Sequence, residues 1–465
     1  MKFSMLNIRL WSMLKLIQKI PLLVFLNLLM TNCYAISFNE KDFLSWLVLN
    51  QSSNVNFSAG EVVHYADKER FRAFVPPGYV DILFFDKMAF TLQPSRKFLP
   101  ALTYQQATTL FAGKPYLDED GVLKNYKAGE PFNPLTLDIN DPFSGYKAAW
   151  NFNYRWQRQG LEGKNSQWIW VRKGGEHDPI DVKDGEFKGM YQGGGTFERI
   201  LNAKYKRVYF NFRADLSDTN YKLKGNFGKD EEYREVINFY APFDIKDTAY
   251  LTIRYLDAKK ADDAWAYIPS TRRVRRVSAE SKSDSLLGTD HTLEDFYCFS
   301  GRIDEHNWKY YGTAKILVVA QSIRAAAFYY GPDGWTANDD WQLKEVDVFA
   351  QIPKRENHPY SVKYIMTDRE NHHAYYCNAF DRSRTIWKVW QQSKLWSEDP
   401  PARKYAKQRG FDVDGINIPV FQSSNAIDLQ ADRGTIVNGT IGGYPLDKEW
   451  KIKREMDVNK LTEGR

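Results

Sequence analysis

The stretch AYLTIRYLDAKKADDAWAYIP, residues 249–269, decides the fold class because its side chains alternate with a period of two. One face of the first run collects apolar side chains, which are Ala249, Leu251, Ile253 and Tyr255. The polar run LDAKKADD then predicts a turn, and Trp265 and Tyr267 share one face of the returning run. The stretch therefore predicts a β-hairpin with an aromatic face.

The same alternation recurs on both sides of this hairpin. It predicts further strands over residues 148–157, 203–212, 341–352, 360–367, 374–380 and 385–390, the last three forming a meander. Short helices are predicted over residues 38–49, 104–111 and 400–408. The 28 Tyr, 29 Phe and 14 Trp of the 465 residues also favour the half-buried surface of strands. The sequence therefore predicts a mainly β protein rich in antiparallel sheet.

The N-terminus has the order of parts of a signal peptide. Four basic and no acidic residues lie in residues 1–35, and the apolar run IPLLVFLNLLM is too short to span a membrane, which takes roughly 20 helical residues. Small residues before Ile36 predict cleavage after Ala35, and lipidation at Cys33 is the alternative. We therefore expect a periplasmic protein without a membrane-spanning segment once residues 1–35 are removed.

The charge and the cysteines of the mature chain follow from this cleavage. Of 64 basic residues four leave with the signal peptide, so 60 basic residues face 58 acidic ones. This balance disfavours a nucleic-acid binder, which normally concentrates basic charge on one surface. Cys298 and Cys377 remain, either as a disulfide in an oxidising compartment or as two buried free thiols.

The expected organisation has four parts. Residues 1–35 are the signal peptide, 36–145 an N-terminal helical and extended region, 146–396 the sheet domain, and 397–465 an irregular C-terminal extension. Large β architectures run well past 200 residues as one domain, so the length alone does not require a second core.

Motifs for nucleophilic catalysis, phosphate binding and zinc binding do not occur in the sequence, which predicts no enzyme, no cofactor and no metal site. His291 lies in TDHTLED among Asp290, Glu294 and Asp295, a group suited to acid–base work or metal binding. A solvated loop is the interpretation that we prefer for it. His372 and His373 are expected to be exposed turn residues.

The one dense charge motif follows the hairpin and consists of Arg272, Arg273, Arg275 and Arg276. Arginine's planar fork suits carboxylate or phosphate groups, which predicts contact with an anionic lipid headgroup or an acidic partner. Ion pairing within the chain, with Asp262 or Asp263, is the alternative.

Four segments together resemble a proteobacterial family of unknown function, family number 1329, over most of the mature chain. They are NYKAGEPF, NDPFSGYKAAWNFNYRW, DDAWAYIPSTRRVRRVS and LEDFYCFSGRIDEHNWKYYG. Members of that family resemble outer-membrane lipoprotein-sorting proteins. The resemblance implies a LolA/LolB-like fold, a strongly curved antiparallel sheet forming an unclosed barrel, with short helices lidding its concave apolar face. It supplies no catalytic residues, and the cysteine in LEDFYCFSG departs from the usual family pattern.

A curved sheet with one apolar face must cover that face with helices or a ligand. The sequence therefore predicts a carrier of a lipid or other hydrophobic molecule, and the resemblance implies service to an RND-type exporter or to outer-membrane lipoprotein or lipid trafficking. The side chains expected to point inward are Leu251, Ile253, Tyr255, Trp265 and Tyr267. The alternatives are ordinary core for these five residues, and for the protein a non-catalytic adaptor that docks to an exporter or an outer-membrane partner.

Overall fold

The structure, a computed structural model, describes residues 38–157, 160–174, 189–257, 260–278, 280–408, 415–443 and 448–463. Residues Asn39–Arg465 form one compact unit, to which all elements named below belong. The predicted signal peptide, its cleavage after Ala35 and the lipidation alternative at Cys33 lie outside the described residues. Among the residues that are described, no helix is long and apolar enough to cross a membrane.

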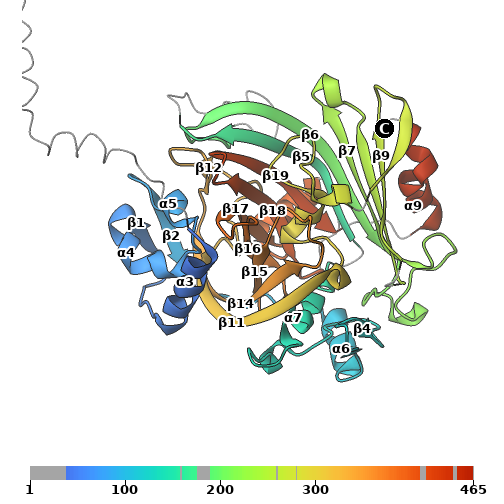
Figure 1. The fold of residues 1–465 in the computed structure, drawn as a ribbon, viewed down its shortest axis with the longest axis horizontal. Helices are drawn as coiled ribbons and strands as arrows, with labels where there is room; N and C mark the ends of the chain where they lie inside the picture. Colours follow the sequence, from blue (N-terminus) through green and yellow to red (C-terminus); the bar gives the residue numbers. More distant parts are fainter. Residues whose placement is uncertain are drawn as a thin grey trace, which may run out of the picture. The chain divides into compact units, whose positions relative to one another are not determined.

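A 15-stranded sheet dominates the described part of the chain (Figure 1). In spatial order its strands are β1 (Glu61–His64), β2 (Ala89–Gln93), β14 (Trp341–Pro353), β15 (Val362–Asp368), β16 (Ala374–Phe380), β17 (Ile386–Trp396), β18 (Pro419–Asp428), β19 (Arg433–Gly443), β5 (Gly160–Arg172), β6 (Thr196–Tyr209), β7 (Glu231–Ala241), β8 (Ala249–Tyr255), β9 (Asp263–Ile268) and β10 (Arg273–Val277), with β11 (His306–Val318) paired to β14. The end strands β1 and β10 do not pair, so the sheet is not closed into a barrel. All pairs are antiparallel except the short β14–β2 contact, which confirms the predicted mainly β class.

Two short strand pairs, seven α-helices and nine short 3-10 helices complete the described elements. The pairs are β3 (Tyr116–Leu117) with β4 (Leu123–Lys124), and β12 (Tyr329–Tyr330) with β13 (Thr336–Ala337). The helices are α3 (Glu40–Ser52), α4 (Lys68–Phe71), α5 (Val80–Leu83), α6 (Leu102–Phe111), α7 (Ser144–Asn153), α8 (Pro400–Gln408) and α9 (Glu449–Met456). Helices α3, α6 and α8 match the three predicted helices within a few residues, the scatter expected at helix ends.

The sheet extends beyond the predicted range of residues 146–396. Strands β18 and β19 come from the expected irregular extension, yet they lie between β17 and β5 in the middle of the sheet. Their buried positions carry polar side chains, including Ser423, Asn425 and Asn438, which hydrogen-bond to neighbouring chain segments. A strand whose buried side chains are polar gives no hydrophobic alternation, which is why the sequence pattern missed both strands.

The strand predicted over residues 148–157 is wrong, because α7 occupies most of this segment. Ala148, Ala149 and Phe152 lie on one face of the helix and pack against Trp308 of β11 and Phe349 of β14. The aromatic residues of AAWNFNYRW satisfy a helical spacing as well as a period of two, and tertiary packing selects the helix.

Strands β6 to β8 bury side chains on both faces of the sheet. Val236 of β7 packs in a cluster with Ile452 and Met456 of α9, and Figure 1 shows α9 beside β9. The neighbouring residue Ile237 packs in a different cluster that contains Phe296. Because successive strand residues point to opposite faces, we name these the helix face and the plug face. The plug segment is residues 284–302, which lie among the strands in Figure 1.

Candidate functional site

The plug segment is held on the sheet by buried charged groups, of which Asp295 is the most enclosed. Its carboxylate lies 2.7 Å from Lys363 Nζ of β15, and neither side chain is exposed. Tyr360 Oη and Thr292 Oγ1 each donate to Asp295 at 2.9 Å. Burial raises the pKa of a carboxyl group, but the charges of Lys363 and Lys388 hold the pKa of Asp295 below its ordinary value. Asp295 is therefore a charged anchor inside the protein.

Glu294 is a second anchor on the same turn. Its carboxylate lies 3.0 Å from His306 Nε2 and 3.2 Å from His358 Nε2, and Gln351 Nε2 donates to it at 2.8 Å. Burial opposes its ionisation, yet the two histidines hold the pKa of Glu294 well below its ordinary value. The turn is thus tied to strands β11 and β14 and to the residues before β15.

Asp290 anchors the start of the turn to the other side of the sheet. Arg433 Nη2 of β19 lies 2.8 Å from its carboxylate, and Thr435 Oγ1 donates to it at 2.8 Å. Lys388 Nζ of β17 donates to the Asp290 backbone carbonyl at 2.9 Å. The plug segment is therefore fixed to strands on both sides of the sheet's centre by polar contacts.

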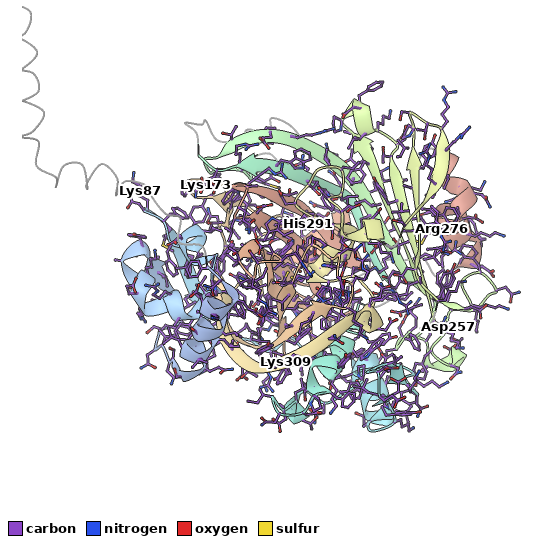
Figure 2. The ribbon with its side chains drawn as sticks, in the orientation of Figure 1. Lys87, Lys173, Asp257, Arg276, His291 and Lys309 are labelled. Atoms are coloured by element: carbon purple, nitrogen blue, oxygen red, sulfur yellow. The ribbon has the colours of Figure 1, made fainter. Side chains whose placement is uncertain are left out.

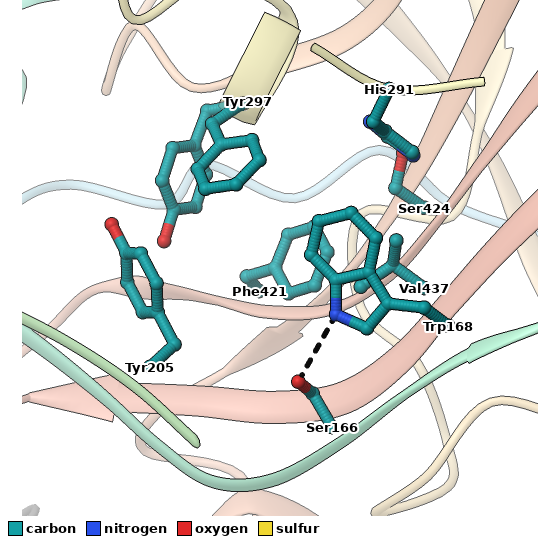
Figure 3. Close-up of a pocket in the computed structure, with 9 residues that line it drawn as sticks. Ser166, Trp168, Tyr205, His291, Tyr297, Phe421, Ser424 and Val437 are labelled. Carbon is teal, nitrogen blue, oxygen red and sulfur yellow. Dashed lines mark hydrogen bonds between the residues drawn. The ribbon is translucent and has the colours of Figure 1, made fainter. Parts of the chain in front are cut away.

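Beneath these anchors lies an apolar cavity between the plug segment and strands β5, β6, β18 and β19 (Figure 3). Its lining residues are Ser166, Trp168, Tyr205, His291, Phe296, Tyr297, Phe421, Ser424 and Val437. The empty space is about 420 Å³, which includes solvent at its open side, so little of it is enclosed. As it stands the cavity has room for a small apolar group, and a longer ligand requires the plug segment to shift.

His291 points into this cavity and is only 4% exposed. The structure gives neither ring nitrogen a hydrogen-bond partner, and Ser424 Oγ on the facing strand also has none. Figure 3 shows the two side chains facing each other, and the imidazole contacts Trp168 edge to face with a centroid distance of 5.3 Å. Burial, aided by Lys388 and Lys363 against the opposing effect of Asp295, lowers the pKa of His291 to about 4. The imidazole is therefore neutral at pH 7.

Two buried cations lie behind the cavity wall. Lys394 Nζ is 5.4 Å from the Phe421 ring centroid, and Arg155 Cζ is 5.4 Å from that of Tyr297. Neither cation forms an ion pair among the described residues; Lys394 donates to Gln392 Oε1 at 2.6 Å and Arg155 to the Phe152 carbonyl. Burial lowers the pKa of Arg155 to about 10 and that of Lys394 to about 7. Positive charge without a carboxylate partner is costly inside a protein.

The five side chains predicted to point inward lie on the helix face. Leu251 and Ile253 are buried with Ile452 and Met456 of α9, and the partly buried aromatic residues Tyr255, Trp265 and Tyr267 pack against the same cluster. None of the five lines the cavity under the plug segment. Alternation placed them correctly on one face but could not show that a C-terminal helix covers that face.

The four arginines lie on or beside the edge strand β10 and are exposed. Arg276 forms an ion pair with Asp263 of β9, the intramolecular alternative considered above. Arg272 precedes the strand with a positive φ of 49°. Figure 2 shows Arg276 far from His291, at the edge of the unit. The arginines are therefore not at the mouth of the plug cavity.

Three histidines expected in solvent are buried. His291 lies in the cavity just described; His372 and His373 are 3% and 6% exposed. His372 pairs with Glu130 at 2.6 Å, and His373 Nε2 lies 3.1 Å from the Trp156 carbonyl. The partners of His372 and His373 lie more than 200 positions away in the chain, so the local polar sequence gave no sign that the two side chains are buried.

Cys298 and Cys377 are free, buried thiols, so the structure holds no disulfide between them. Burial and the neighbouring Cys298 raise the pKa of the Cys377 thiol well above its ordinary value. Gln392 Nε2 lies 3.4 Å from Cys298 Sγ. The plug segment and β16 are thus brought into contact through these two side chains. No group of three or more His, Cys, Asp and Glu side chains in the described ranges could hold a metal ion.

Comparisons with known proteins agree with the sequence resemblance. A family model described as "Protein of unknown function (DUF1329)" matches residues 66–451. A DUF1329 family protein from Desulfovibrio piger is 17% identical, with a TM-score of 0.43 and coverage of 69% of this chain and 100% of that one. A LolA superfamily protein from Nitrosomonas europaea is 12% identical, with a TM-score of 0.35 and coverage of 65% and 92%. No curated protein matches the chain.

Proposed function

The chain belongs to the DUF1329 family, and from that premise we propose that it is a periplasmic carrier of an amphiphilic molecule whose apolar part enters the cavity under the plug segment. The observation that carries the proposal is the cavity itself. Its wall is mostly aromatic and apolar, yet it contains His291 and Ser424, two buried polar groups without hydrogen-bond partners. Buried polar groups are normally satisfied, so orphaned ones in a cavity favour a ligand that supplies the partner.

The apolar part of the ligand would supply most of the affinity. Each buried methylene contributes on the order of 0.8 kcal/mol, so a chain of about ten buried carbons reaches micromolar affinity without further contacts. The small free volume means that such a chain would displace Phe296 or Tyr297. Both belong to the plug segment, and Tyr297 has a positive φ of 60°, a conformation that costs energy for a bulky residue. This strain favours release of the turn when a ligand enters.

The head group that we propose is anionic. Arg155 and Lys394 lie behind Tyr297 and Phe421 without a carboxylate partner, and an entering carboxylate or phosphate would compensate their charge. Binding requires no proton transfer. His291 and Ser424 are not hydrogen-bonded to each other, so they do not form the activated pair that nucleophilic catalysis uses. We therefore propose a non-catalytic role. We further propose that the carrier delivers this molecule to an RND-type exporter or an outer-membrane partner, on the basis of the family resemblance.

The test is to express the chain with its own leader, purify it from the periplasm without detergent, and identify extracted hydrophobic molecules by mass spectrometry. Val437→Phe fills the cavity and should abolish co-purification, whereas Trp265→Leu on the helix face should leave it unchanged. Loss in Trp265→Leu alone would instead place the ligand at the five residues predicted from the sequence. A protein that carries nothing and takes up no fluorescent fatty acid is not a carrier.

The anionic head group has its own test. A fatty acid should bind more tightly than the fatty alcohol of equal length, and Lys394→Met should remove most of that difference, a factor of roughly ten for one charge-assisted contact. Equal affinities for the two ligands in the unmodified protein would contradict an anionic head group while leaving the hydrophobic cavity in place.

A further inference from the structure

A second and roomier cavity lies away from the plug cavity, where α7, the segment at residues 122–126 that contains β4, and the ends of β7 and β8 meet. Its empty space is about 1090 Å³, which includes solvent at its open side. Its wall includes Tyr126, Trp150, Tyr154, Phe212 and Glu232. Unlike the plug cavity, it has room for a small ligand without any movement of the chain.

Four aromatic rings form one side of this cavity. Tyr126 and Tyr154 stack with centroids 4.1 Å apart, and Trp150 is parallel to Tyr154 within 12° at 5.8 Å. Phe212 meets Tyr126 and Tyr154 at 5.1 and 5.2 Å. Two of the rings are fixed by their polar atoms, because Tyr126 Oη donates to the Gly129 carbonyl at 2.7 Å and Trp150 Nε1 to the Gly121 carbonyl at 2.9 Å. The wall is therefore a rigid aromatic group.

The charged residues that line the cavity are Lys124, Glu232, Arg254, Asp257, Arg302 and Asp304. Lys124 pairs with Asp118 and Arg302 with Asp304, whereas Glu232 is poorly partnered. It is 5% exposed, and its hydrogen bonds from Asn153 Nδ2 and Tyr154 Oη are long, at 3.3 and 3.5 Å. The ion pairs of the described residues include none to Glu232. The guanidinium group of Arg254 is engaged elsewhere, by Asp262 at 2.9 Å and by the Ser300 carbonyl at 2.8 Å. Burial accordingly raises the pKa of Glu232 despite the charge of Arg254.

The backbone of the cavity wall is also strained at two places. Phe212 and Asn125 both line the cavity and have φ values of 62° and 55°, in the left-handed region. This conformation is costly for an aromatic residue and persists only where the surrounding structure imposes it. The contacts of the Phe212 ring with Tyr126 and Tyr154 are part of the packing that imposes this conformation.

We propose that this cavity is a binding site for an organic ammonium group, a quaternary ammonium or a protonated amine. Such a cation would give the Glu232 carboxylate the partner that the chain does not provide, and the aromatic rings would stabilise it through cation–π contacts. The basic residues of the lining, Lys124, Arg254 and Arg302, already have carboxylate partners, whereas Glu232 has no ion pair among the described residues, which favours a cationic over an anionic ligand. The proposal is independent of the plug cavity, which takes a different chemical class at a different place.

The test uses choline and its neutral isostere 3,3-dimethylbutan-1-ol with the purified mature protein, by isothermal titration calorimetry. Choline should bind, and the isostere, which has the same shape without the charge, should bind at least roughly tenfold more weakly, since it can form neither the cation–π contacts nor the charge-assisted contact. Equal binding of the two ligands, or no binding of choline, ethanolamine or putrescine at 10 mM, would overturn the proposal.

Variants assign the binding to this cavity. Glu232→Gln keeps the size of the side chain and removes its charge, and it should weaken choline binding at least roughly tenfold. Glu69→Gln, whose side chain is 73% exposed and pairs with Arg72, is the matched control and should bind as the unmodified protein does. Choline binding that survives Glu232→Gln unchanged would place the cation elsewhere and overturn the assignment.

A second variant keeps the test decisive if Glu232→Gln does not fold. Phe212→Leu retains an apolar side chain and removes one ring, and it should weaken choline binding several-fold without affecting the neutral isostere. An unchanged choline affinity in this variant would exclude the aromatic wall from the site. Binding of N-acetylglucosamine in place of choline, lost in Glu232→Gln, would make the cavity a saccharide site and overturn the ammonium assignment.

Discussion

The helix face and the plug face of strands β6 to β8 are closed in different ways. On the helix face, Ile452 and Met456 of α9 are fully buried against Leu251 and Ile253. On the plug face, the covering segment is held by charged groups such as Asp295, and an apolar cavity remains beneath it. An apolar cover gains free energy from every contact it keeps, whereas a charged anchor has alternative partners in water. The carrier proposal therefore assigns ligand entry to the plug face and not to the helix face.

The largest effect should come from breaking a plug anchor. Lys363→Met removes the cation from Asp295 and leaves a carboxylate buried without its charge partner, which costs about 3–5 kcal/mol. Denaturant unfolding should report this loss at pH 7. The exposed Lys354→Met is a suitable control and should change the unfolding free energy by less than about 0.5 kcal/mol. A small effect of Lys363→Met would mean that the plug segment is not held by this ion pair.

On the helix face, creating a cavity should lower stability without changing ligand uptake. Ile452→Ala removes a fully buried side chain of α9 and should lower the unfolding free energy by about 2–5 kcal/mol. Uptake of a fluorescent fatty acid by the folded variant should not change, because no residue of the plug cavity touches this position. Altered uptake would show that the two faces are coupled and would weaken the contrast drawn between them.

The sequence predicted the strands of the helix face much better than the plug segment. Alternation gave β8 and β9 nearly residue for residue, because in β8 apolar side chains on the helix face alternate with more polar ones, and in β9 aromatic side chains on that face alternate with alanines. It could not give the plug segment, whose TDHTLED residues look like a solvated loop. Their burial depends on partners such as Lys363 and Arg433, which are between about 70 and 140 positions away in the chain. Ion pairs between residues far apart in the chain leave no local sequence pattern, so most of the candidate site could not be predicted from the sequence.

His291 should make the plug face sensitive to pH. Its pKa is lowered to about 4 in the folded protein from 6.5 in the unfolded chain, so the unfolded chain binds the extra proton between these values. Stability is therefore lost as the pH falls from 6.5 towards 4, at up to about 1.4 kcal/mol per pH unit. His291→Phe should remove about 2 kcal/mol of the decrease between pH 7 and pH 5, measured by denaturant unfolding at each pH. An identical decrease in both proteins would show that the ring is not buried in its neutral form.

The smallest stability effect should come from the arginines of the edge strand, which separate a structural role from a binding role. Arg276 is 63% exposed in its ion pair with Asp263, and exposed pairs contribute at most about 1 kcal/mol. Arg275 is exposed, and replacing both Arg275 and Arg276 with glutamine should change the unfolding free energy by less than about 1 kcal/mol.

If these side chains contact an anionic surface, as the sequence predicts, the same double variant should lose binding to vesicles that contain phosphatidylglycerol. Added salt should weaken vesicle binding of the unmodified protein. Unchanged vesicle binding would leave ion pairing with Asp263 as the whole role of Arg276. Because β10 ends the sheet far from His291 in Figure 2, either result would leave the plug cavity proposal as it is.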